Sequence, residues 1–251
     1  MSSIFHIISE EFSTDIEAIS DLISLVSNGG GSSKSRIASI NSATLLLAAT
    51  FEEFVREMAR QYARELVART TDVSDVPRKL TATAWKRALQ DMSKAKIDNE
   101  GEASSLLHIA TEARSEFDAI CKFLEGDLSQ NIYKHVAHNE NNMRPDQMNA
   151  IFNVSGVKNI CQKISEVDSL QTYLGEDDAG RTNSKFRQAL NNLMDRRNSI
   201  AHSLNPASSV GVGQFREDLH LLKAVGIAMA TYLPLQLPAI TQAEEAAVDG
   251  V

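Results

Sequence analysis

Cysteine, proline and long apolar runs are scarce in this chain of 251 residues. Its two cysteines, Cys121 and Cys161, show no CxxC spacing, so we expect free buried thiols in a reducing cytoplasm. Five prolines and twelve glycines are few for this length, which disfavours a many-stranded sheet because sheets need frequent turns. No run approaches the roughly twenty apolar residues of a membrane span. The first residues also lack the basic start and apolar stretch of a signal peptide, so we expect a cytoplasmic protein. The scarcity of proline and glycine leads us to expect that it is helical.

Charge is unevenly distributed along the chain. A net charge of −8 argues against a protein that coats nucleic acid through bulk electrostatics. The stretch from residue 181 to 197 nevertheless contains a single anion, Asp195, and five cations: Arg181, Lys185, Arg187, Arg196 and Arg197. A basic island on an acidic body suits a protein that binds one phosphate site. The alternative is a solvated helix face.

Apolar residues recur at helical spacing through most of the chain and predict an all-α bundle of seven to nine helices. The expected helices cover residues 2–26, 35–69, 78–92, 102–124, 145–152, 160–164, 183–201 and 213–232. Residues 128–136 fit a short helix or a strand equally well. We expect an N-terminal helix with a Gly/Ser linker over residues 1–35, one helical domain over 36–235, and a flexible acidic tail over 236–251.

The most informative stretch is Arg197-Asn198-Ser199-Ile200-Ala201-His202, at the end of a predicted helix. Arginine is a permanent cation that can bind a phosphate through two N–H groups, and histidine changes charge near neutral pH. Breaking a phosphodiester beside a 2′-hydroxyl needs a base, an acid and a cation, but no metal or other cofactor. We therefore expect neither. His135 and His138 are three residues apart, yet no nearby cysteine or HExxH pattern supports a zinc site.

Helix geometry restricts how these residues can act together. Asn198 and His202 are four residues apart and share a helix face, whereas Arg197 and His202 lie roughly 140° apart around the axis. The helix could distort between Ser199 and His202. Alternatively, two copies of the chain could line a common cleft, each contributing an arginine and a histidine. We favour the dimer.

The motif Arg197-Asn198-x-x-x-His202 resembles the signature of the HEPN superfamily, in which an arginine, a polar residue and three further positions precede a histidine. Two other features are similar to the RiboL-PSP-HEPN subgroup. They are the helical stretch containing Phe51-Glu52-Glu53-Phe54 and the Asn-rich loop over residues 139–145 that leads into a helix. The resemblance covers about residues 37–232.

This resemblance implies an α-helical, dimerising domain that in many members is a metal-independent endoribonuclease of toxin–antitoxin or anti-phage systems. By resemblance, Arg197 binds and polarises the scissile phosphate, His202 is the general base or acid, and Asn198 orients His202 or contacts the phosphate. Arg196 is a candidate helper in substrate binding. The expected products are a 2′,3′-cyclic phosphate and a 5′-hydroxyl. Expected partners are RNA, a second copy of the chain, and an antitoxin or sensor protein, with no membrane. The alternative is a non-catalytic nucleotide- or protein-binding HEPN module.

Overall fold

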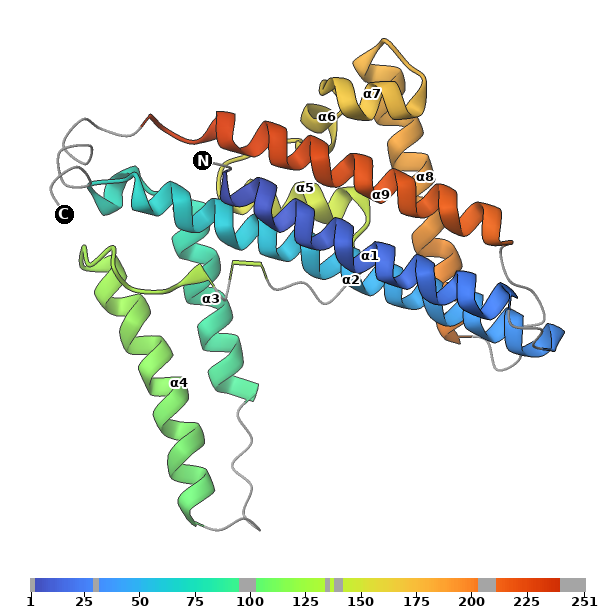
Figure 1. Cartoon of the computed structure of the whole chain (residues 1–251). Coiled ribbons are helices and arrows are strands. Elements are labelled where there is room, and N and C mark those ends of the chain that lie inside the picture. The colour runs from blue at the N-terminus through green and yellow to red at the C-terminus, as the bar shows by residue number, and fades with distance from the viewer. Residues whose placement is uncertain are drawn as a thin grey trace, which may run out of the picture. The chain divides into compact units, whose positions relative to one another are not determined.

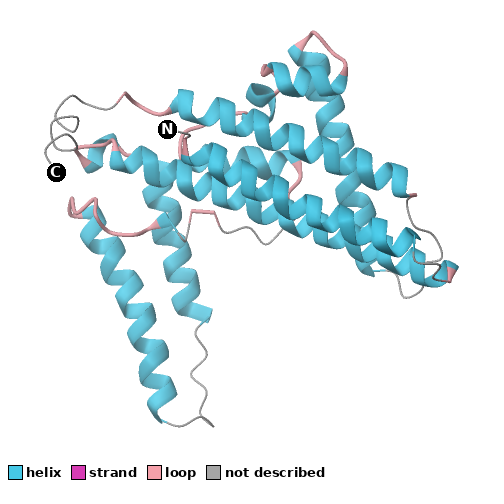
Figure 2. Cartoon of the chain, in the orientation of Figure 1, coloured by secondary structure: helices cyan, strands magenta, loops and turns pink. Residues whose placement is uncertain are grey.

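The structure is a computed structural model of the chain, and it describes residues 3–28, 32–94, 103–133, 136–137, 142–202 and 211–239. Over these residues the chain forms helices and turns but no strand (Figure 2), which confirms the predicted all-α fold. The described part contains nine α-helices, α1 (Ile4–Asn28), α2 (Ser33–Ala68), α3 (Arg78–Lys94), α4 (Ala103–Leu124), α5 (Pro145–Val154), α6 (Ile160–Ile164), α7 (Asp168–Leu174), α8 (Ala179–His202) and α9 (Val212–Tyr232). None of these helices combines the length and the apolar character that a bilayer span requires.

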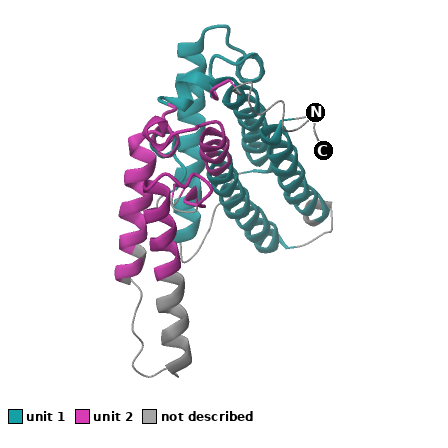
Figure 3. Cartoon of the chain, turned by 90° about the vertical axis from the view of Figure 1, so that its left-hand side faces the viewer, with its two compact units in different colours: residues 1–58, 139–150, 158–236 teal, residues 59–138, 151–157, 237–251 magenta. Residues whose placement is uncertain are grey.

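The chain divides into two compact units, coloured separately in Figure 3. Unit 1 contains residues 1–58, 139–150 and 158–236, and unit 2 contains residues 59–138, 151–157 and 237–251. Both α1 and the first part of α2 belong to unit 1. The domain limits predicted at residues 35 and 235 stay a prediction. Most of the predicted acidic tail, from residue 240 onward, lies outside the described residues.

In unit 1, α1 packs lengthwise against α9 and beside the first part of α2 (Figure 1). Phe12 of α1 stacks on Phe54 of α2 with ring centroids 4.2 Å apart, and Phe51 completes this buried aromatic cluster. Gly226 of α9 faces the cluster, because a Cβ at that position would lie 3.4 Å from a ring carbon of Phe12. The missing side chain therefore allows α9 to approach α1 closely.

Helix α8 carries the motif and contributes one face to the core of unit 1. The buried residues of this face recur at helical spacing and are Thr182, Phe186, Leu190, Leu193 and Met194. The helix begins at Ala179, earlier than the predicted start at Asn183, because Asp178 Oδ1 accepts a hydrogen bond from the backbone N–H of Arg181 at 2.8 Å. Such a carboxylate satisfies an N–H group that has no partner within the helix.

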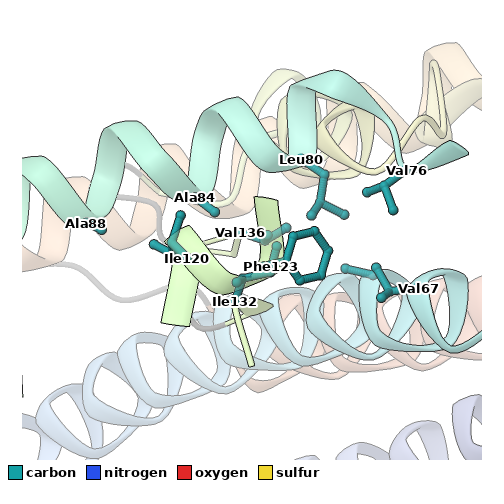
Figure 4. Close-up of a cluster of buried hydrophobic side chains, with 10 residues drawn as sticks. Val67, Val76, Leu80, Ala84, Ala88, Ile120, Phe123, Ile132 and Val136 are labelled. Atoms are coloured by element: carbon teal, nitrogen blue, oxygen red, sulfur yellow. The ribbon is translucent and has the colours of Figure 1, made fainter. Parts of the chain in front are cut away.

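Unit 2 has its own apolar core between α3 and α4 (Figure 4). Phe123 of α4 and Leu80 of α3 are fully buried there. The core also includes Ile132 from the segment that follows α4. Residues 128–133, for which the sequence fitted helix and strand equally, contain turns but neither an α-helix nor a strand.

Helix α7 is the one described helix that the apolar spacing did not predict. It has only seven residues and a single buried apolar side chain, Leu170, so it produces no periodic pattern. Its ends do carry signals that could have revealed it. Asp168 lies in the first turn, and Gly175 ends the helix with a positive φ of 63°, a conformation that glycine adopts readily.

Candidate active site

The motif residues occupy the last turns of α8, which continues as an α-helix to His202. The distortion considered between Ser199 and His202 is therefore not observed. Arg197 is half-buried, and by ideal helix geometry it lies in line with the buried Leu190 and Leu193. His202 is exposed and lies roughly 140° from Arg197 around the helix axis. A single copy of α8 thus does not bring the guanidinium and the imidazole together.

Most of the basic island is neutralised by carboxylates. Four of its five cations form ion pairs, namely Arg181 with Glu176 and Asp177, Lys185 with Glu176, Arg187 with Asp146, and Arg196 with Asp218. Arg197 is the exception in this stretch, because no carboxylate in the described part of the chain pairs with it. Its only hydrogen bond there is from Nη1 to Asn198 Oδ1, at 3.4 Å. The island is therefore not a broad positive surface but a single uncompensated cation at the motif.

Arg196 is held by a carboxylate of α9. Both oxygens of Asp218 accept hydrogen bonds from Arg196 Nη2 at 2.6 Å, and Gln214 adds a third at 3.2 Å. The Asp218 side chain is only 5% exposed. Burial raises the pKa of this carboxyl above its ordinary value, and the hydrogen bonds and charge of Arg196 only partly offset that effect. The pair fastens α8 to α9, so a role of Arg196 in substrate binding, which stays a prediction, would require the pair to open.

A short segment that leads into α5 and includes its first two residues lies along the other flank of α8. We call residues 142–146 the strap. Arg144 Nη2 forms an ion pair with Asp195 Oδ1 at 2.6 Å, and Asn142 Nδ2 donates to Asn198 Oδ1 at 2.5 Å. The Asn-rich loop is recognisable in the sequence, but its contacts with α8 are not. Residues 139–141 of the loop lie outside the described residues.

The described residues offer no evident metal site, since no group of three or more His, Cys, Asp or Glu side chains gathers among them in a suitable arrangement. His135 and His138 lie outside the described residues. Cys161 is buried as expected, whereas Cys121 is only half-buried. Burial raises the pKa of Cys161 to about 12, which keeps the side chain a neutral thiol rather than a thiolate ligand or nucleophile.

The family model described as RiboL-PSP-HEPN matches residues 10–234, which include the motif, the strap, most of α1 and all of α9. No curated protein and no solved structure shows significant similarity to the chain.

Proposed function

We propose, because this chain belongs to the RiboL-PSP-HEPN family, that it is a metal-independent endoribonuclease. The observation that carries the proposal is the state of Arg197. An arginine that is partly removed from water and paired with no carboxylate among the described residues remains available to an anion. A cation in such a setting acts on a phosphate more strongly than one in bulk water, because the surrounding dielectric is lower.

In the proposed reaction, the 2′-oxygen of the RNA attacks the adjacent phosphorus while the bond from phosphorus to the 5′-oxygen breaks. One imidazole accepts the proton of the 2′-hydroxyl, and a separate group, the general acid, donates a proton to the departing 5′-oxygen. Arg197 stabilises the negative charge that builds up on the phosphoryl oxygens. The products are a 2′,3′-cyclic phosphate and a 5′-hydroxyl, and no water or metal takes part in the bond changes.

We further propose that the working unit is a homodimer with a composite site. The separation of Arg197 and His202 around a continuous α8 supports this, because a second copy beside the helix could supply the missing group. Each site would then take its arginine from one copy and its histidine from the other, so that the dimer contains two equivalent sites. The proposed setting is a cytoplasmic toxin–antitoxin or anti-phage system, in which an antitoxin or sensor protein controls the activity.

The alternative function is a non-catalytic nucleotide- or protein-binding module. The same angular separation favours it for a monomer, in which Arg197 could grip a phosphate without an imidazole nearby. A ligand-induced rise in melting temperature without RNA turnover would support this reading over the first.

The test of ribonuclease activity is cleavage of a single-stranded RNA by the purified protein in EDTA. His202→Ala is expected to lower the rate by about 10²–10⁴-fold, the usual contribution of a general acid or base. The matched control is His220→Ala, since His220 is another exposed histidine of unit 1 but lies outside the motif. RNA with a 2′-deoxy residue at the cleaved position should resist wild-type protein. Equal cleavage by wild type and His202→Ala would contradict the proposal and indicate a contaminating nuclease.

A further inference from the structure

The strap alternates between buried and polar contacts as it runs beside α8. Met143 and Pro145 are buried, whereas the residues between and around them reach polar side chains of α8. These contacts proceed in order along the helix: Asp146 with Arg187, Arg144 with Asn191 and Asp195, and Asn142 with Asn198. The strap therefore runs antiparallel to α8, and its Asn142 end reaches the motif.

The buried core fixes the position of the strap independently of these polar contacts. Met143 is 0% exposed. The thiol of Cys161 donates to the carbonyl oxygen of Pro145 at 3.3 Å, and the backbone N–H of Cys161 donates to Asn149 Oδ1 at 3.1 Å. Asn142 is thus placed next to α8 by a segment that packing already holds.

The contacts of Asn198 determine which way its amide faces. Its Oδ1 accepts hydrogen bonds from Asn142 Nδ2 at 2.5 Å and from Arg197 Nη1 at 3.4 Å. Because a guanidinium can only donate, the Asn198 atom beside Arg197 must be the oxygen rather than the nitrogen. Both lone pairs of Oδ1 are then engaged, and Nδ2 is left as a donor that has no acceptor among the residues the structure describes.

We infer that Asn142 is a positioning residue, which holds the Asn198 amide so that Nδ2 donates to the RNA phosphate bound by Arg197. This inference rests on the proposed function and decides between the two roles that the sequence left open for Asn198. An asparagine that oriented His202 through its oxygen would need a free lone pair on Oδ1, and none remains. Orientation through Nδ2 would need a hydrogen bond from Nδ2 to the imidazole, and the structure has none between these two described residues. Asn198 instead adds an N–H group beside the guanidinium, so that the phosphate meets two kinds of donor.

The test is a double-mutant cycle with Asn142→Ala, Asn198→Ala and the double variant. Two quantities are measured in EDTA, namely the cleavage rate of single-stranded RNA and the affinity for a 2′-O-methylated RNA that cannot be cleaved. Each single variant is expected to lose about 10-fold in both quantities, as for a hydrogen bond to a charged group. The double variant should lose no more than Asn198→Ala alone, because Asn142 acts only through Asn198.

The matched control is Asn192→Ala, which removes an exposed asparagine on another face of α8 and should leave both quantities unchanged. Thermal unfolding of every variant shows whether a loss reflects global destabilisation. Losses that add up in the double variant, or an Asn142→Ala variant that behaves as wild type, overturn the inference. If wild type binds the methylated RNA but cleaves no RNA, the proposed activity fails while the affinity cycle still decides the role of Asn142. If wild type binds neither RNA, both proposals fail.

Discussion

The separation of Arg197 and His202 around α8 predicts that two inactive variants can restore each other. Because α8 is an unbroken helix over Ala179–His202, the five-residue spacing places the two side chains roughly 140° apart. If each site takes its arginine from one copy and its histidine from the other, Arg197→Ala and His202→Ala damage different halves of the same site. A heterodimer of the two variants then contains one complete site and one site that lacks both groups.

The expected size of this effect follows from counting sites. A heterodimer of Arg197→Ala with His202→Ala should retain about half of the wild-type activity, because one of its two equivalent sites is intact. Each parent homodimer should retain only about 10⁻²–10⁻⁴ of that activity, if the lost group contributes as a general acid or base does. The two expectations differ by more than tenfold, which a simple rate measurement resolves.

The assay uses heterodimers purified through a different affinity tag on each copy and measures RNA cleavage in EDTA. The matched control pairs a wild-type copy with a copy carrying both Arg197→Ala and His202→Ala. A site shared between copies predicts that this control is nearly inactive, because each site has lost one group. A site within one copy predicts the reverse, an inactive heterodimer of single variants and a half-active control. That reversed pattern would refute the composite site.

Three further predictions concern groups that hold the site and the core. Burial raises the pKa of Asp218 above its ordinary value of 3.8. The stability of wild type relative to Asp218→Asn should therefore be greatest below pH 3.8 and decline as the pH rises through the raised pKa. Urea unfolding of both proteins over a pH series measures this difference. Gly226→Val should lower the free energy of unfolding in urea by about 1–3 kcal/mol, because even a Cβ would lie 3.2 Å from the nearest side-chain oxygen. Gly213→Ala should raise it by up to about 1 kcal/mol, because a Cβ there would have no neighbouring atom within 4 Å. Burial raises the pKa of Cys161 to about 12, so alkylation of the native protein near neutral pH should label Cys121 and spare Cys161 until the protein unfolds, as peptide masses would report.

The sequence predicts the helices that bury a long apolar stripe, because such a stripe repeats often enough to be recognised. Helices α2 and α9 begin and end within two residues of their predicted limits. Helix α7 was missed because its one buried apolar residue, Leu170, sets up no period. The start of α8 was placed too late because its first turn depends on the capping carboxylate of Asp178 rather than on apolar residues.

The candidate site, like the fold, is only partly predictable from the sequence. Arg197, Asn198 and His202 are close in sequence, so their spacing could be recognised without a structure. Their surroundings could not, because Asp218 and Asn142 come from distant parts of the chain and meet α8 only through tertiary packing. The charges in the sequence also predict too large a positive patch, since a sequence does not show which cations have carboxylates within reach.

The ion pairs formed by the cations of residues 181–197 reconcile the acidic net charge of the protein with the proposed cleavage of RNA, a polyanion. Net charge acts over the whole molecule and governs long-range attraction, which salt screens beyond about 8–10 Å at physiological ionic strength. Stabilisation of a phosphorane depends instead on the few donors within hydrogen-bond distance of its oxygens. Carboxylates that neutralise Arg187 and Arg196 weaken the first effect but do not affect the second, for which the proposed donors are Arg197 and Asn198. The net charge of −8 therefore argues against non-specific RNA binding without arguing against cleavage at this site.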